Sequence, residues 1–491
     1  MAEGHGGAGD GPRRGPRRRS AQTPAERQRR ADPARDTAYR TLRAVADGAD
    51  ANLALPHQLR RAGLQGRDAA FTTELTYGTL RMQGLYDAVV AVAAQRPADQ
   101  VDAPVLDVLR LGAHQLLAMR VPDHAAVSAT VALARHHVSQ GSGGFVNAVL
   151  RRVSERSREA WVDAVTEGVD DPLQRLAVEH SHPLWIVRAL RAALLGHGSS
   201  TGGTVHDDLR DLLAAHNTPG PLALAARPGL GAEEDLSAAG GHPADVARTA
   251  WTLQSGDPAA IPAVRDGRAA VQDAGSQLVT LALLAAPVDG ADRRWLDLCA
   301  GPGGKAGLLA AAARERGAHL RANELSEHRA ELVRHTLRAA VAAGADVEVT
   351  VGDGRDVGEE SPASYDRVLV DAPCTGLGAL RRRPEARWRR TPSDLTGLGP
   401  LQRALLTSAL AAVRPGGAVA YATCSPHLAE TRLVVSDVVK RVGGVLVEDT
   451  RPLVTDRAGA PLPSLGEGPG AQMWSHLHGT DGMFVTVLRK E

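Results

Sequence analysis

Apolar residues recur at every third or fourth position from about residue 33 to 195, which is the spacing of one face of a helix. In one such segment Leu106, Leu109, Ala113 and Leu117 share a face. The pattern predicts helices over 35–46, 66–79, 83–93, 104–119 and 127–140, with breaks at 63, 97, 122–123 and 141–144. We therefore expect an all-α bundle of short helices, followed by a Gly/Ser/Thr linker at 196–204.

A different pattern begins after a mixed stretch that ends near residue 265. Short apolar runs typical of strands cover 295–299, 319–324, 347–352, 366–370, 418–423, 444–448 and 483–488. Helical patterns lie between or after them at 305–316, 326–343, 401–413 and 427–442. This alternation predicts a mostly parallel, doubly wound α/β sheet. The last two strands have no obvious full helix between them, which favours an antiparallel edge strand.

Length, charge and cysteine content narrow the class of protein. The 491 residues suit about three domains. Net charge is +1, so any affinity for nucleic acid must come from local patches. Eight arginines against three acids in 1–30 predict a disordered basic tail over 1–32, either merely solvated or weakly attracted to RNA. No apolar run spans a bilayer and no secretory signal is recognisable, so we expect a soluble, cytoplasmic protein.

The cysteines number only three, and this odd, sparse count argues against a disulfide framework. They form no CxxC pair, which argues against a structural zinc site. We expect no metal. Cys374 and Cys424 each follow a predicted strand, in the sequences DAPCTG and ATCSP. Because ligands bind at the carboxyl ends of the strands in such a sheet, both thiols should face one crevice. Free cysteines are more often buried small hydrophobes, and that alternative fits Cys299 better.

The first predicted strand ends in a glycine-rich loop, DLCAGPGGK at 297–305, that runs into a helix. A phosphate-binding P-loop fails here, because Cys299 and Ala306 replace the required glycine and Ser/Thr. A dinucleotide loop survives only in its alanine variant, and an adenosylmethionine loop is the third possibility. Glu324 and Asp353 end the next two strands, where carboxylates can accept from ribose hydroxyls and an adenine amino group. Helix capping is the alternative for each acid.

These motifs together resemble a known family. LDLCAGPGGK, DAPCTGLGALRRRPEARW and YATCSPHLAE are similar to the Sun/RsmB family of S-adenosylmethionine-dependent RNA cytosine-C5 methyltransferases. The helical region, ending in GFVNAVLRR at 144–152, resembles the NusB-like RNA-binding domain of the bacterial ribosomal RNA enzymes. The resemblance implies a NusB-like domain at 33–160, connecting helices, linker and a small subdomain at 161–265, and a Rossmann-like class I catalytic domain at 266–491.

The resemblance also implies roles for residues. Cys424 would be the nucleophile that attacks carbon 6 of cytosine, and Cys374 would assist product release. The cofactor S-adenosylmethionine would lie against Cys299, Ala300, Gly301, Pro302, Gly303, Gly304, Lys305, Glu324, Arg329, Asp353 and Asp371. Asp371 would also contact the target base.

An arginine-rich run follows the Cys374 loop. Residues 381–390 hold six arginines and one acid, and we expect Arg381, Arg382, Arg387 and Trp388 to bind RNA by phosphate contacts and stacking. A solvated basic loop is the alternative.

The sequence thus favours a monomeric methyltransferase acting on 16S ribosomal RNA. Transfer RNA stays open as a substrate, and a non-catalytic RNA-binding or assembly factor is the rival from another class. A DNA cytosine-C5 methyltransferase is disfavoured, because such enzymes resemble a plan with one cysteine, in the fourth-strand motif. A flipped or single-stranded target base is expected.

Overall fold

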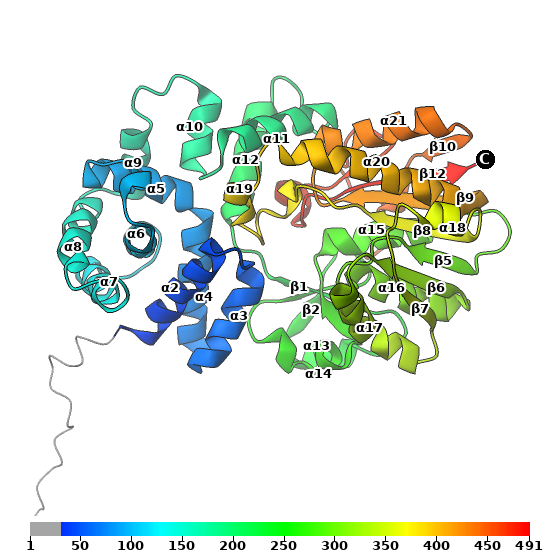
Figure 1. Cartoon of the computed structure of the whole chain (residues 1–491), viewed down its shortest axis with the longest axis horizontal. Helices are drawn as coiled ribbons and strands as arrows, with labels where there is room; N and C mark the ends of the chain where they lie inside the picture. Colours follow the sequence, from blue (N-terminus) through cyan, green and yellow to red (C-terminus); the bar gives the residue numbers. More distant parts are fainter. Residues whose placement is uncertain (1–30) are drawn as a thin grey trace, which may run out of the picture.

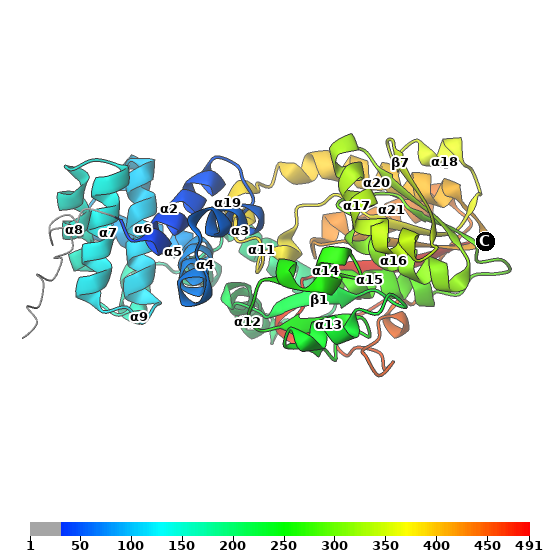
Figure 2. The same ribbon diagram turned by 90° about the horizontal axis from the view of Figure 1, so that it is seen from below.

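The computed structural model describes residues 31–491, so nearly all of the predicted basic tail lies outside the described residues. A helical bundle occupies one end of the molecule and an α/β body the other (Figures 1 and 2). No helix in the described part is long and apolar enough to cross a bilayer.

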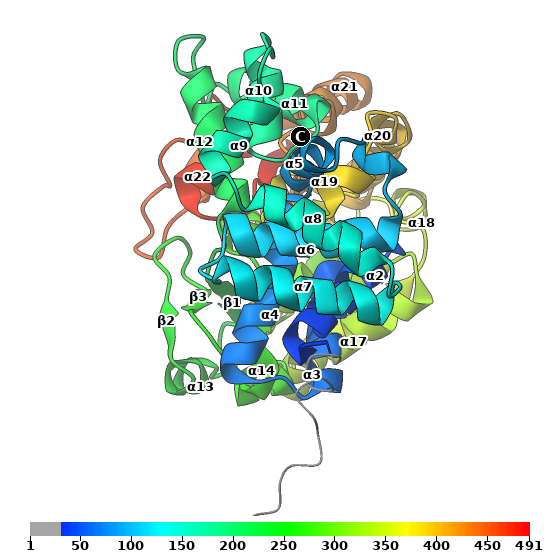
Figure 3. The same cartoon turned by 90° about the vertical axis from the view of Figure 1, so that its left-hand side faces the viewer.

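The N-terminal bundle buries one continuous apolar core that includes Leu42, Leu85, Val108 and Leu150. Helices α6, α7 and α8 form its outer layer (Figure 3). Its helices are α2 (Pro33–Ala46), α3 (Ala51–Ala62), α4 (Gly66–Arg81), α5 (Gln83–Ala94), α6 (Ala103–Leu117), α7 (Asp123–His137), α8 (Ser142–Val153) and α9 (Arg158–Val165). The five predicted helices are all present.

Three further helices of the bundle, α3, α8 and α9, were not among the ranges that the pattern predicted. Helix α3 carries Pro56 in its interior, and α8 begins at Ser142, inside the glycine-rich stretch that predicted a break. In α8 the lack of a side chain at Gly143 has a packing reason: a Cβ there would lie 2.7 Å from Nε of Arg135 on α7. Tertiary packing of α8 against α7 thus overrides the low helix propensity of glycine.

Three connecting helices pack against the α/β body rather than forming a loose tether. They are α10 (Pro172–Glu179), α11 (Leu184–Gly196) and α12 (Val205–Asn217), and their core is shared with Leu377, Leu380 and Trp474. The predicted linker at 196–204 corresponds to the loop between α11 and α12. It is a turn inside this cluster, where Trp474 Nε1 donates to Ser199 Oγ at 2.8 Å.

A small antiparallel sheet follows, in the order β2-β3-β1-β4. Its strands are β1 (Leu222–Ala226), β2 (Gly241–Pro243), β3 (Ala250–Leu253) and β4 (Ala269–Val271), with α13 (Glu233–Ala238) and α14 (Pro262–Asp266) packed against it.

The main sheet has the strand order β10-β12-β9-β8-β5-β6-β7. Its strands are β5 (Arg294–Asp297), β6 (His319–Glu324), β7 (Asp346–Val351), β8 (Tyr365–Asp371), β9 (Val413–Thr423), β10 (Val445–Glu448) and β12 (Phe484–Lys490), and β11 (Ala471–Gln472) pairs with β12. All seven predicted strands are confirmed. Strand β12 is antiparallel to both neighbours, but it lies between β9 and β10, so the edge strand is β10.

Helices cover both faces of this sheet, as expected for a doubly wound fold (Figure 1). One core lies under α15 (Ala274–Ala285), α16 (Gly304–Arg316) and α17 (Glu327–Ala342), and the other under α20 (Asp394–Ala412) and α21 (Arg432–Val442). Short helices α18 (Val357–Glu360), α19 (Ala386–Arg389) and α22 (Ser475–His478) complete the body. Strands β5 to β9 are mutually parallel, so their carboxyl ends meet at one edge.

Candidate active site at the carboxyl ends of the parallel strands

The glycine-rich loop joins β5 to α16 in a tight turn. Gly303 precedes the first residue of α16 with φ +94°, and a Cβ on it would lie 2.9 Å from the Cβ of Thr336 on α17. Only glycine combines this backbone conformation with so close an approach. Thr336 in turn donates its hydroxyl to the carbonyl of Pro302 at 2.9 Å, which holds the loop against α17.

The two predicted ribose and adenine acids end β6 and follow β7. Glu324 is buried, and its carboxylate accepts the backbone N–H of Gly301 at 3.0 Å and of Ser326 at 3.1 Å. Arg329 lies 3.1 Å from the same carboxylate. Asp353 accepts from the backbone and side chain of Arg355, which lowers its pKa. Neither acid occupies an N-cap position, so helix capping does not explain them.

One cavity of about 850 Å³ connects these groups. Among the predicted cofactor residues it is lined by Cys299, Gly301, Pro302, Glu324, Arg329, Asp353 and Asp371, and it also reaches Cys374 and Cys424. Ala300, Gly303, Gly304 and Lys305 belong to the same loop and helix start but do not line it. Its volume falls within the range of sites for small molecules, about 300–1,000 Å³. Burial and nearby carboxylates raise the pKa of Cys299, which fits packing rather than nucleophilic chemistry.

Lys305 and Asp371 form an ion pair beside the thiols. The Nζ of Lys305 lies 2.6 Å from Oδ2 of Asp371 at the end of β8. Burial alone would lower the pKa of Lys305, but Asp371 outweighs it and raises that pKa. The ammonium is therefore held in its charged form inside the site.

The two strand-end cysteines face each other. Their Sγ atoms lie 3.3 Å apart, although 50 residues separate them in the chain. The hydrogen bond between the two thiols, together with Lys305, lowers the pKa of Cys424 against burial and the charge of Asp371, which raise it. The same hydrogen bond and burial raise the pKa of Cys374. Cys424 is thus the thiol more easily ionised, which suits a nucleophile, and Cys374 is the one that keeps its proton.

The arginine-rich run lies at the joint between the bundle and the α/β body, and it is partly buried and partly exposed. Arg387, predicted to bind RNA, is fully buried: its guanidinium donates to the carbonyls of Arg81 and His216 and to Oδ1 of Asn217. The structure does not fit that prediction, because the guanidinium of Arg387 is fully buried between the bundle, α12 and α19, where a phosphate cannot reach it. Arg389 likewise donates to carbonyls of Val45 and Ala49.

The other three predicted RNA-binding residues have mixed surroundings. Arg381 is largely buried and donates to the carbonyl of Gly479, and Arg382 is paired with the buried Asp481. Trp388 is 38% exposed, and its ring lies close to Gly84 of α5. Arg383, Arg389 and Arg390 line the active-site cavity and were not singled out from the sequence, although the arginine run itself was the signal.

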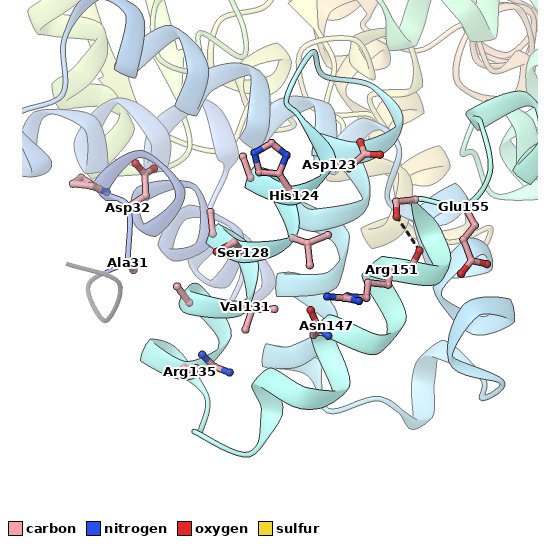
Figure 4. A pocket seen from close by; sticks show the side chains of 16 residues that line it. Ala31, Asp32, Asp123, His124, Ser128, Val131, Arg135, Asn147, Arg151 and Glu155 are labelled. Carbon is pink, nitrogen blue, oxygen red and sulfur yellow. Dashed lines mark hydrogen bonds between the residues drawn. The ribbon is translucent and has the colours of Figure 1, made fainter. Parts of the chain in front are cut away.

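A second hollow lies in the bundle, between α7, α8 and the start of α2, with a volume of about 1190 Å³. Arg135, Asn147 and Arg151 line it together with Ser128 and His124 (Figure 4). Acidic residues Asp32, Asp123 and Glu155 stand at its rim, so its charge is mixed.

Comparison with known proteins decides the family. The model described as 16S rRNA methyltransferase RsmB/F matches residues 282–489, and the NusB family model matches 32–155. A Mycobacterium tuberculosis protein, named as a methyltransferase without a stated substrate, is 49% identical over 97% of this chain and 98% of its own. Ribosomal RNA small subunit methyltransferase B of Pseudomonas putida is 32% identical over 92% of this chain and 97% of its own. The chain belongs to the RsmB/F family.

This RsmB/F enzyme is therefore an S-adenosylmethionine-dependent RNA cytosine methyltransferase with an N-terminal NusB domain. The crystal structure of PH0851 has the same fold, with a TM-score of 0.74 at 20% identity over 94% of this chain and 99% of that one. Membership of the RsmB/F family excludes two alternatives raised by the sequence, a DNA cytosine-C5 methyltransferase and a non-catalytic RNA-binding factor.

Proposed function

We propose that the enzyme methylates carbon 5 of a cytosine in 16S ribosomal RNA through a covalent bond to Cys424. The observation that carries the chemistry is the pair of thiols 3.3 Å apart, beside the Lys305–Asp371 ion pair. Support for the substrate comes from the Pseudomonas putida relative, which is named for the small-subunit ribosomal RNA. We place the reaction in the cytoplasm and expect the enzyme to act as a monomer.

The donor set fits the cofactor. Glu324, Asp353 and Asp371 line one cavity with the glycine-rich loop, and three carboxylates there suit a cationic ligand. Glu324 would accept the ribose hydroxyls and Asp353 the adenine amino group, while Gly301 and Pro302 leave the backbone open to the ligand. When bound, S-adenosylmethionine supplies an electrophilic methyl group.

The residues of the chain divide the remaining chemistry between them. The thiolate of Cys424 adds to carbon 6 of the base, which turns carbon 5 into an enamine-like nucleophile. Asp371, held by Lys305, would bind the base. Once carbon 5 carries the methyl group and Cys424 is bonded to carbon 6, Cys374 would give up its own proton to solvent and then, as a thiolate, accept the carbon-5 proton. The electron pair of that C–H bond re-forms the double bond and the bond from carbon 6 to sulfur breaks, which restores the Cys424 thiolate.

RNA would approach across both ends of the molecule. Arg390 and Trp388 lie on the joint beside the active-site cavity, and Arg135 and Arg151 line the bundle hollow. We propose that Trp388, Arg381 and Arg382 contact the RNA where they are exposed, with phosphates held by arginine.

Bisulfite sequencing of total RNA tests the substrate. Cells lacking the gene should lose one methylated cytosine in 16S ribosomal RNA and regain it when the gene is restored. Loss of a transfer RNA site instead, with 16S ribosomal RNA unchanged, would contradict the proposed substrate while leaving the chemistry intact.

Substitution of each cysteine tests the mechanism. Cys424→Ala should abolish both methyl transfer and covalent RNA attachment, because the attacking thiolate is gone. Cys374→Ala should still attack and methylate but fail to release, so that methylated RNA migrates with the protein on a denaturing gel. Cys299→Ala is the control for loss of a thiol: any change should appear in the KM for S-adenosylmethionine, and the variant should still form and release the RNA adduct. An adduct with Cys424→Ala and none with Cys374→Ala would show that the roles are exchanged.

A further inference from the structure

Glu430 is a buried carboxylate behind the two cysteine loops that the proposed chemistry leaves unused. It ends the short 3₁₀ helix Leu428–Glu430 that follows the Cys424 loop, and it is 1% exposed. Its side chain does not line the active-site cavity. The three groups that donate hydrogen bonds to its carboxylate are all neutral. Burying a carboxylate without a cation beside it costs free energy, so these hydrogen bonds must offset that cost.

Two of those partners belong to Thr375, the residue after Cys374. Glu430 accepts the backbone N–H of Thr375 at 2.7 Å and its hydroxyl at 2.5 Å. The third partner is the amide of Gln402, at 3.2 Å, which also donates to the carbonyl of Pro373 at 2.8 Å. The residues on both sides of Cys374 are therefore fixed to one carboxylate, directly or through Gln402.

The same carboxylate reaches the Cys424 loop through Thr375. The hydroxyl oxygens of Thr375 and Ser425 lie 3.2 Å apart, and Ser425 follows Cys424. Because Thr375 gives its proton to Glu430, its oxygen is left to accept the proton of Ser425. Ser425 Oγ then accepts the backbone N–H of His427 at 3.3 Å. The chain of donors runs in one direction, from His427 through Ser425 and Thr375 to Glu430.

The position of Glu430 itself is anchored on β9. The hydroxyl of Tyr421 donates to its backbone carbonyl at 2.8 Å, and Tyr421 is fully buried. A second tie between the loops runs from the N–H of Gly378 to the carbonyl of Cys424 at 2.9 Å. The spacing of the two thiols thus depends on a rigid polar frame with one acceptor at its end.

We infer that Glu430 is a positioning residue that sets the distance between the Cys374 and Cys424 thiols by holding both loops through Thr375. This inference rests on the roles proposed above for the two cysteines. The substitution Glu430→Gln would keep the shape of the side chain but supply only one acceptor oxygen. Its amide group would then face the N–H of Thr375 or force the hydroxyl chain to reverse, and either change shifts Cys374 relative to Cys424.

The test is Glu430→Gln in the full-length enzyme with 16S ribosomal RNA. We expect kcat to fall about tenfold or more, because a misplacement near 1 Å can cost about a hundredfold. The KM values for RNA and S-adenosylmethionine should stay unchanged, since Glu430 touches neither. The fraction of enzyme trapped as covalent RNA adduct should rise, as we expect for Cys374→Ala.

Companion variants separate positioning from folding. Thr375→Val removes the hydroxyl and should behave like Glu430→Gln, whereas Thr375→Ser keeps it and should restore turnover. Asp366→Asn is the matched control: this buried carboxylate accepts the backbone N–H of Arg293 and Arg294 at the opposite end of β8. It should lower Tm without changing the adduct fraction of folded enzyme. If Glu430→Gln fails to fold, the comparison of Thr375→Val with Thr375→Ser tests the inference instead.

The inference is overturned if Glu430→Gln and Thr375→Val keep wild-type kcat and adduct fraction per folded molecule, or if Asp366→Asn changes them equally. Alkylation of both thiols by iodoacetamide in RNA-free enzyme gives a readout independent of the cysteine roles. A changed ratio of the two rates in Glu430→Gln supports positioning, and an unchanged ratio overturns it. A Cys374→Ala enzyme that traps no adduct would instead count against the proposed function.

Discussion

Asp297 ends β5 just before the glycine-rich loop and is fully buried. Its carboxylate oxygens have no well-formed hydrogen bond among the described residues. Burial, and then the nearby charge of Asp371, raise its pKa to about 7. Below about pH 7 Asp297 is mostly protonated, so the site then carries fewer negative charges in the absence of a cationic ligand.

The raised pKa of Asp297 predicts a particular pH dependence of stability. Because the folded state binds this proton more tightly than the unfolded state, the contribution is full below about pH 4 and is lost as pH rises through about 7. In cofactor-free enzyme, the Tm of Asp297→Asn should rise relative to that of wild type as pH increases from about 4 to 8. At pH 8 the free energy of unfolding of the variant should exceed that of wild type by on the order of 2 kcal/mol or more.

Asp353→Asn is the contrasting control for that titration. The pKa of Asp353 is lowered by Arg355, so its contribution is present above about pH 4 and is lost as pH falls. The Tm difference of Asp353→Asn should therefore stay flat between about pH 4 and 8 and change only below about pH 4, whereas that of Asp297→Asn should change across the pH 4–8 range. A flat Tm difference for Asp297→Asn between pH 4 and 8 would show that Asp297 is ionised in the free enzyme.

At the scale of elements, what the sequence could predict follows its local periodicity. All seven strands of the main sheet that the pattern predicted are present, because alternating and apolar runs are local signals. The Cys374 and Cys424 loops were placed at one crevice for the same reason, since parallel strands end at one edge. Glu430 was missed because nothing local marks an acid in HLAE as the partner of Thr375, 55 residues away.

Helix α19 is a case where the local sequence does not predict whether a side chain is buried. A run of arginines predicts an exposed basic surface, but burial depends on which carbonyls of distant segments converge on it. Arg387 finds such acceptors on Arg81, His216 and Asn217 and becomes part of the core of the joint. Burial, and then the charge of Arg81, lower its pKa to about 9, which is the expected cost of burying a guanidinium with no acid beside it.

Arg387→Lys should destabilise the enzyme by about 3 kcal/mol, because an ammonium cannot reach all of these acceptors and each buried acceptor left unpaired costs about 1–3 kcal/mol. Denaturant unfolding should detect the loss, and the bundle should begin to unfold separately from the α/β body. Arg390→Lys, at the end of the same helix but at the cavity wall, is the control and should leave stability within about 0.5 kcal/mol. Equal stability of the two variants would show that Arg387 does not hold the joint.

On the scale of the whole molecule, three segments of the chain meet at one place. The bundle, the connecting helices α10–α12 and the loop after Cys374 share contacts through α19. The connecting helices belong with the α/β body, since they bury Leu377, Leu380 and Trp474. His197 Nε2 also bonds to the carbonyl of Pro426, next to the Cys424 loop, at 2.9 Å. We therefore propose that the catalytic unit begins near residue 171, where Asp171 caps α10.

This boundary predicts different behaviour for two fragments. Residues 171–491 should fold and bind S-adenosylmethionine about as tightly as the whole chain, because the cavity and its supporting helices are intact. Arg387 would keep its acceptors on α12 and lose only Arg81. Residues 205–491 should be less stable by several kcal/mol, since each large apolar side chain that is uncovered costs about 1.5–3 kcal/mol. Thermal unfolding with and without S-adenosylmethionine measures both.

Both fragments should methylate 16S ribosomal RNA less efficiently than the whole chain, because each lacks the NusB domain. In the fragment 171–491 only the NusB domain is missing, because its catalytic unit is complete. Its KM for RNA should therefore rise, while its affinity for S-adenosylmethionine should stay the same. Wild-type efficiency in 171–491 would show that the bundle does not bind substrate. Equal Tm in the two fragments would mean that α10 and α11 are not part of the catalytic unit, and that the turn at 197–204 separates two independent bodies after all.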